Sequence, residues 1–183
     1  MLTQQVSTKP KSNLDFRLMS LTYRVRDFLQ PRMNILKEVG IKPGFHVLDY
    51  GCGPGTYIAA LAELVGDSGK IYALDVHPLA IQAARMIASR KRLTNVQTVL
   101  SDRRTGLSPN SVDAVLLYDT LHDLADPSGV LKELHRVLRP KGVLSVSDHH
   151  MKQDEIMSRL TSGGLFRLLT RGKRTYSFTR EGL

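Results

Sequence analysis

The stretch HVLDYGCGPGTYIAALAELVG, residues 46–66, holds the pattern that decides the fold. It opens with an apolar run typical of a buried β-strand, passes through a glycine-rich turn, and continues with the periodicity of a helix. The glycines at the turn are Gly51, Gly53 and Gly55, and glycine lets a backbone approach a ligand with no side chain in the way. A strand, a glycine turn and a helix in this order predict a site for a nucleotide-type ligand.

Strand and helix patterns alternate along the rest of the chain. Strands are predicted at 46–50, 70–76, 96–101, 112–118 and 142–148, and helices at 56–65, 78–92, 127–139 and 153–162. This order predicts an α/β fold, a doubly wound and mostly parallel sheet with helices on both faces. The segment DRRTGLSPNS at 102–111 is too short for a long helix, so the crossover between the third and fourth strands should be abbreviated.

The two ends of the chain depart from this alternation. The tail GLFRLLTRGKRTYSFTR, residues 164–180, has the pattern of two strands about a turn, which predicts an antiparallel hairpin at one edge of the sheet. Before the first strand, the apolar spacing over 14–29 predicts an amphipathic helix. A second helix should begin at Pro31 and end near Gly40.

The length and composition of the chain exclude several classes of protein. Its 183 residues suit a single domain, which we place at 31–183 behind a tail and lid helix at 1–30. No long apolar run or signal-peptide pattern is present, so we expect no membrane partner and a cytoplasmic location. The single cysteine, Cys52, excludes an internal disulfide and a multi-thiolate zinc site.

The net charge of +9 allows an anionic partner such as a nucleic acid. The basic residues are spread along the chain, and only 6% of the residues are aromatic, so solvated helix and loop faces explain the charge better. We therefore favour a small-molecule partner over a macromolecule, and the oligomeric state is left open.

Three aspartates end three successive predicted strands. Asp49 stands two residues before Gly51, where a carboxylate would repel the pyrophosphate of a dinucleotide, so an NAD-dependent dehydrogenase fits poorly. A ligand with a cationic amino-acid portion, such as S-adenosylmethionine, fits better. Asp75, at the end of the second strand, is placed to accept both hydroxyls of a ribose, and Asp102, at the end of the third, to accept a hydrogen bond from an adenine amino group.

These motifs together resemble the class I S-adenosylmethionine-dependent methyltransferases, in particular the group related to ubiquinone/menaquinone methyltransferases. The similarity is carried by VLDYGCGPG (47–55), ALDVHP (73–78), SD (101–102) and the segment 113–148. The resemblance implies S-adenosylmethionine as cofactor and a seven-stranded sheet whose last strand is antiparallel. It also implies that Tyr118 lies beside the methionine portion of the cofactor, and Val76 belongs to the ribose motif.

The predicted N-terminal helix is the only evident lid over such a site, because the links between the later strands are short. Tyr23 and Phe16 of this helix are candidates to cover the sulfonium, since an aromatic ring attracts a cation. A helix that only packs against the sheet would give the same pattern.

Histidines occur where the fourth and fifth strands should end. Methyl transfer from a sulfonium is an in-line displacement, so a protein base helps only when the acceptor must lose a proton. His122 in YDTLHDL resembles a histidine common in the family; we favour a structural or cofactor-side role for it and keep it as a catalytic candidate. One of His149 and His150 in SVSDHH is the candidate base. Adjacent strand residues point to opposite faces, so we expect no metal site at this pair.

The sequence therefore predicts a methyltransferase that uses S-adenosylmethionine and acts on an unidentified, preferably small acceptor. Two alternatives stay open: an RNA or protein methyltransferase that uses the basic surface, and a non-catalytic S-adenosylmethionine-binding subunit.

Overall fold

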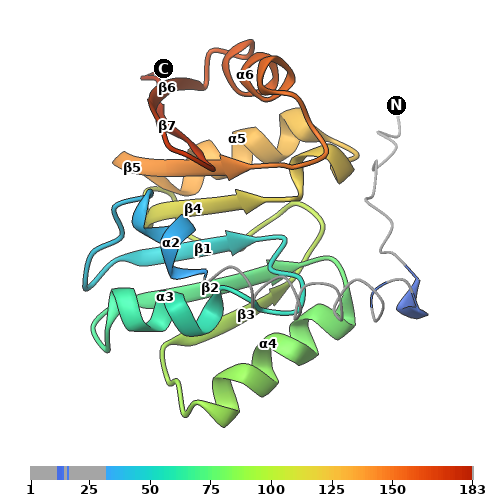
Figure 1. The fold of residues 1–183 in the computed structure, drawn as a ribbon, viewed down its shortest axis with the longest axis vertical. Coiled ribbons are helices and arrows are strands. Elements are labelled where there is room, and N and C mark those ends of the chain that lie inside the picture. Colours follow the sequence, from blue (N-terminus) through green and yellow to red (C-terminus); the bar gives the residue numbers. More distant parts are fainter. Residues whose placement is uncertain (1–11, 15, 17–31, 183) are drawn as a thin grey trace.

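Seven strands form one sheet in the part of the chain that the computed structural model describes, which comprises residues 12–14, 16 and 32–182 (Figure 1). The strands are β1 (His46–Tyr50), β2 (Lys70–Asp75), β3 (Val96–Leu100), β4 (Val112–Tyr118), β5 (Leu138–Ser147), β6 (Phe166–Arg171) and β7 (Tyr176–Arg180). Their order across the sheet is β3-β2-β1-β4-β5-β7-β6. The predicted α/β class and the seven-stranded sheet are confirmed.

The strand directions bring many chain segments to one edge of the sheet. Strands β1 to β5 are parallel, whereas β7 runs antiparallel to both of its neighbours, β5 and β6. The carboxyl ends of the five parallel strands therefore meet at one edge, which we call the carboxyl edge. Because β7 runs the other way, the turn from β6 to β7 also lies at the carboxyl edge. The predicted antiparallel hairpin is confirmed.

Helices cover both faces of the sheet, with α2, α3 and α4 on one face and α5 and α6 on the other (Figure 1). The described helices are α2 (Met33–Lys37), α3 (Ile58–Val65), α4 (Pro78–Arg90), α5 (Pro127–Val137) and α6 (Gln153–Thr161), with a 3-10 turn, η1, at Leu121–Asp123. Val130, Leu134 and Val137 show why α5 packs as it does: apolar residues recur every three or four positions and are buried against the sheet.

Element boundaries differ from the predicted ones mainly at the fifth strand. The sequence predicts a turn before residue 142, but β5 begins at Leu138, directly after α5. Leu138 pairs with Val112, and the register then shifts so that Val143 pairs with Ala114. The RPKG segment is thus an irregularity within the strand, as expected where a proline cannot donate a ladder hydrogen bond. The strand also ends one residue early, at Ser147.

The crossover between β3 and β4 is abbreviated, as predicted, and residues 101–111 contain no helix. Glu133 of α5 holds this loop: its Oε1 accepts hydrogen bonds from the backbone N–H and the hydroxyl of Thr105, at 2.9 and 2.6 Å. Arg136 donates to the same carboxylate and to the carbonyl of Leu107, each at 2.8 Å. The bonds from Arg136 and Thr105 lower the pKa of Glu133 to about 2, so the carboxylate stays ionised.

The N-terminal predictions are only partly covered by the described residues. Most of the predicted helix at 14–29, including Tyr23, lies outside them, as does Pro31. The described part of the second helix is α2, which is followed by a turn that ends at Gly40.

Candidate active site at the carboxyl edge

The glycine turn between β1 and α3 is tied to the end of β2. The backbone N–H of Gly51 donates to the carbonyl of Leu74, and that of Gly53 donates to Oδ2 of Asp75, both at 2.8 Å. Gly51, Gly53 and Gly55 all have positive φ, a conformation that favours glycine. The turn is therefore held in one shape at the carboxyl edge.

Gly51 has no room for a side chain, which is a packing reason for glycine at this position. A β-carbon here would lie 2.3 Å from Oγ1 of Thr120, which follows β4, and φ is +79°. The sequence pattern suggests only close approach of a ligand, whereas the structure adds close approach of a neighbouring loop.

We expect Gly51→Ala to lower the free energy of unfolding by about 1–3 kcal/mol, because it combines a strained φ with overpacking. Denaturant unfolding followed by circular dichroism measures this loss. Gly40→Ala is the matched control, since Gly40 has a φ of +74° but no described heavy atom within 4 Å of a β-carbon. Equal losses in the two variants would contradict the contribution of Thr120.

Asp49 is a buried acid at the end of β1. It is 2% exposed, and its Oδ2 has no hydrogen-bond partner among the described residues. Burial and the nearby Asp75 raise the pKa of Asp49 to about 7, against the opposing positive charge of Arg32. An unsatisfied buried carboxylate oxygen is costly, so the site fits a ligand that brings a charged hydrogen-bond donor. The ammonium group of S-adenosylmethionine is such a donor.

Asp75 lies beside the glycine turn and is 9% exposed. Its Oδ1 accepts a hydrogen bond from the N–H of His77 at 2.8 Å, and its Oδ2 accepts the one from Gly53. A carboxylate oxygen has two lone pairs, so each can still accept a ribose hydroxyl. The acid therefore braces the turn as well, a structural role that sequence reasoning missed.

Phe16 brings the N-terminal segment to the carboxyl edge. Its ring stacks on that of His77, with 4.5 Å between the ring centroids, and both side chains are buried. The sequence offers Phe16 as a candidate to cover the sulfonium. In the structure Phe16 contacts His77, which lies two residues after Asp75, the candidate ribose acid.

The remaining cofactor candidates are distributed along the same edge. Val76 lies between Asp75 and His77, and Asp102 is exposed, with its carbonyl accepting a hydrogen bond from the Tyr50 hydroxyl at 3.1 Å. Tyr118 is buried at the end of β4, and its hydroxyl lies 2.8 Å from Oγ of Ser145.

Two residues beside Tyr118 were not found from the sequence. The ring of Tyr57 meets that of Tyr118 edge to face, with centroids 5.2 Å apart. Arg32 donates a hydrogen bond to the Tyr57 hydroxyl at 3.1 Å. No local pattern marks either residue, because their partners are far away in the sequence.

His122 and Asp148 form a close pair at the ends of β4 and β5. Nδ1 of His122 lies 3.0 and 2.9 Å from the two carboxylate oxygens of Asp148, whose side chain is fully buried. The backbone N–H of His122 also donates to Asp148, at 3.1 Å. Asp123 lies 3.4 Å from Nε2, on the other side of the ring. The imidazole is thus held by Asp148 at Nδ1, with Asp123 close to Nε2.

The three predicted histidines are gathered together. Nδ1 of His149 lies 2.7 Å from Oδ1 of Asp119, and the ring of His150 lies between the other two, 3.8 Å from His149 and 4.4 Å from His122 between centroids. The expectation that His149 and His150 point to opposite faces is wrong, because β5 ends at Ser147 and strand alternation stops there.

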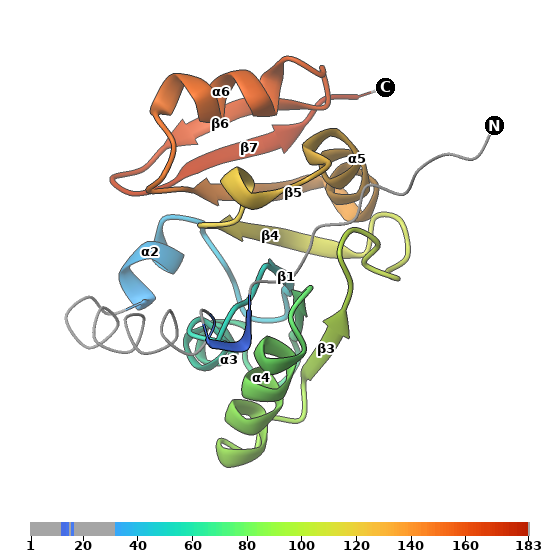
Figure 2. The same ribbon diagram turned by 90° about the vertical axis from the view of Figure 1, so that its right-hand side faces the viewer.

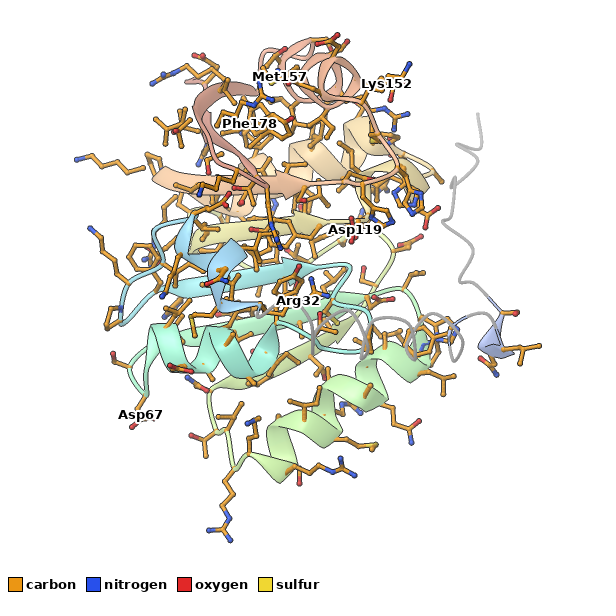
Figure 3. The ribbon with its side chains drawn as sticks, viewed as in Figure 1. Arg32, Asp67, Asp119, Lys152, Met157 and Phe178 are labelled. Carbon is orange, nitrogen blue, oxygen red and sulfur yellow. The ribbon has the colours of Figure 1, made fainter. Side chains whose placement is uncertain are left out.

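Figure 3 shows Asp119 beyond the end of β4 and Lys152 at the start of α6 on the same side of the molecule, with Asp67 at the opposite edge.

Among the residues that the structure describes, no group of three or more histidine, cysteine, aspartate or glutamate side chains is arranged to hold a metal ion.

A doubly wound sheet of this order, with a glycine turn after its first strand and acids at the ends of its first two strands, agrees with the predicted class, the S-adenosylmethionine-dependent methyltransferases. The chain belongs to the methyltransferase domain family (Methyltransf_31), whose model matches residues 41–178. The cofactor of this class is S-adenosylmethionine, in agreement with the unsatisfied Oδ2 of Asp49.

Several known proteins are similar to this chain. A solved SAM-dependent methyltransferase from Aquifex aeolicus is 28% identical, with a TM-score of 0.79 over 93% of this chain and 98% of that one. Demethylmenaquinone methyltransferase of Geobacillus stearothermophilus is 32% identical over 64% of this chain and 51% of its own length. The ubiquinone/menaquinone biosynthesis C-methyltransferase of Shewanella oneidensis is 27% identical over 79% of this chain and 61% of its own.

The chain spans about half the length of the demethylmenaquinone methyltransferases that it matches. Among the described residues, no helix has the length and apolar character needed to cross a membrane.

Proposed function

We propose that this protein transfers the methyl group of S-adenosylmethionine to a small molecule whose acceptor atom must lose a proton, such as a ring hydroxyl or an acidic ring carbon. The observation that carries this proposal is the His122–Asp148 pair at the carboxyl edge. Two relatives are named for methylation in menaquinone or ubiquinone biosynthesis. Those names support an acceptor related to quinones.

The cofactor would be held by residues along the carboxyl edge. Asp49 would accept a hydrogen bond from its ammonium group, Asp75 from the ribose hydroxyls with Val76 alongside, and Asp102 from the adenine amino group. Tyr118 would lie beside the methionine portion. When bound, S-adenosylmethionine supplies an electrophilic methyl group, and the protein's task is to align the acceptor with it and exclude water.

His122 is the proposed base. Asp148 would accept a hydrogen bond from Nδ1–H, which leaves Nε2 unprotonated and able to take a proton from the acceptor. Asp123, at 3.4 Å from Nε2, would then stabilise the imidazolium that forms. We favour His122 over His149 because the side chain of His122 is 22% exposed and its partner Asp148 is fully buried. The side chain of His149 is 56% exposed. His149 and His150 would shape the acceptor side.

The raised pKa of Asp49 predicts a pH-dependent affinity for S-adenosylhomocysteine. An ammonium group next to Asp49 favours the carboxylate, so the pKa of Asp49 falls below about 7 in the complex and binding releases a proton. Affinity should therefore weaken by up to about tenfold per pH unit as the pH falls below 7, and stay level above 7. Isothermal titration calorimetry from pH 5.5 to 8.5 measures this dependence.

The matched control for this titration is Asp49→Asn, which keeps the shape but cannot ionise. It should bind weakly at every pH, with the dependence gone. If the unaltered protein binds equally well across the range, the proposed contact between Asp49 and the ammonium is wrong.

We also propose that residues 1–30 act as a lid on the domain at 31–183, with Tyr23 over the cofactor. The stack of Phe16 on His77, next to Asp75, supports contact between the N-terminal segment and the cofactor site.

A cytoplasmic location of the protein stays a prediction.

The experiment that tests the function is transfer of radiolabelled methyl from S-adenosylmethionine to an extract of the native cells, separated into small molecules, RNA and protein. Label in small molecules, absent with the Asp75→Ala variant, supports the proposal. Label in RNA or protein would replace it with a macromolecular acceptor. Cofactor binding with no label in any fraction would favour a non-catalytic subunit.

A further inference from the structure

The turn between β6 and β7 brings a cationic segment to the same edge as the proposed base. Arg171 pairs with Tyr176, and Tyr176 pairs with Val146, which lies two residues before Asp148. Strands lie about 4.8 Å apart, so the backbone of Arg171 is about 10 Å from β5, within reach of a small molecule. Tyr176 also packs against the core cluster that contains Leu121, the residue before His122.

The turn is fixed in place by Glu38, which follows α2. Oε2 of Glu38 accepts hydrogen bonds from the backbone N–H groups of Arg174 and Thr175, both at 3.1 Å, and from the Thr175 hydroxyl at 2.9 Å. A β-carbon at Gly172 would lie 2.1 Å from the same oxygen. Figure 2 shows the hairpin turn and α2 on the same side of the sheet. The turn is thus a positioned feature of this edge.

Two positive charges at this turn, those of Arg171 and Lys173, are not neutralised within the described structure. Arg171 and Lys173 are both exposed, and no described residue forms a salt bridge with either side chain. The guanidinium of Arg171 lies over the ring of Tyr176, 5.7 Å from its centroid, which limits its positions.

The described acids at the carboxyl edge bind other groups, and none of them forms a salt bridge with Arg171 or Lys173. Asp148 is bound to His122, Asp119 to His149, and Glu38 to the turn itself. Glu155 of α6 accepts a hydrogen bond from the backbone of Lys152. An anionic group that reaches the turn would therefore find Arg171 and Lys173 without a competing salt bridge from the described residues.

We propose that the methyl acceptor carries an anionic group, a carboxylate or a phosphate, which Arg171 and Lys173 bind while its acceptor atom faces His122. This inference rests on the proposed function. A guanidinium and an ammonium both recognise an anion, and Arg171 and Lys173 are two residues apart at the turn. The proposal also gives two of the basic residues behind the net charge of +9 a function at the site, a function that composition alone does not identify.

The first test uses the labelled small molecules from the extract. The labelled product should be retained on an anion-exchange column at neutral pH. Alkaline phosphatase treatment then distinguishes the two groups, because a phosphate monoester loses its retention and a carboxylate keeps it. Label in an unretained compound would overturn this inference and leave the proposed function standing. Absence of label would overturn both.

The second test compares two double variants with the isolated acceptor. Arg171→Gln with Lys173→Gln should raise the KM for the acceptor at least tenfold, leaving kcat and the affinity for S-adenosylhomocysteine within twofold. Arg90→Gln with Lys141→Gln removes one arginine and one lysine away from the carboxyl edge and should leave the KM unchanged. Equal KM values for both pairs, or a loss confined to kcat, would contradict the inference.

Discussion

Replacing Asp75 by alanine is expected to weaken binding of S-adenosylhomocysteine about 100-fold or more. A hydrogen bond to a charged group contributes about 1.5–3 kcal/mol, and Asp75 is proposed to accept two from the ribose. The variant also releases the N–H groups of Gly53 and His77 that the carboxylate now binds. Isothermal titration calorimetry gives the loss, with a far-UV spectrum to check that the variant is folded.

A second ligand separates the ribose contact from the bracing of the turn. An analogue of S-adenosylhomocysteine without the two ribose hydroxyls should bind the unaltered protein much more weakly, but should bind the Asp75→Ala variant about as well as the parent ligand does. An equal penalty for the analogue in both proteins would show that Asp75 acts only through the glycine turn. Asp67→Ala, at the opposite edge (Figure 3), is the control that should leave binding unchanged.

Replacing His122 by alanine is expected to lower the rate of methyl transfer by about 10²–10⁴-fold, because a positioned general base contributes about that factor. The affinity for S-adenosylhomocysteine should change little. Asp148→Asn should also lower the rate strongly, because an amide cannot hold the same imidazole tautomer in place. Single-turnover transfer of labelled methyl to the isolated acceptor measures both effects.

The other histidines test this assignment. His149→Ala should lower the rate less than His122→Ala, and His46→Ala, at the start of β1, should leave the rate unchanged. A full rate with His122→Ala and a large loss with His149→Ala or His150→Ala would move the base to the exposed pair. Full rates of methyl transfer in the alanine variants of His122, His149 and His150 would show that the acceptor needs no base from these three histidines.

Most of the fold follows from local patterns. The alternation of strand and helix periods, the glycine turn and the hairpin tail predicted the elements and the sheet, because period and turn chemistry depend on neighbouring residues. The sequence misplaced the two ends of β5. The observed ends depend on the pairing of Leu138 with Val112 and of Ser147 with Tyr118, which no local pattern reports.

The sequence by itself determined the class of this protein, since the glycines and the aspartates at the ends of successive strands are spaced by the fold's repeating unit. Only the tertiary structure decided which residues meet: Asp148 with His122, Thr120 against Gly51, and Glu38 with the turn of β6 and β7. The physical reason is that a carboxylate that is buried or half-buried takes whichever donors the packed chain brings within hydrogen-bond distance, and those donors come from segments 26 and 137 residues away.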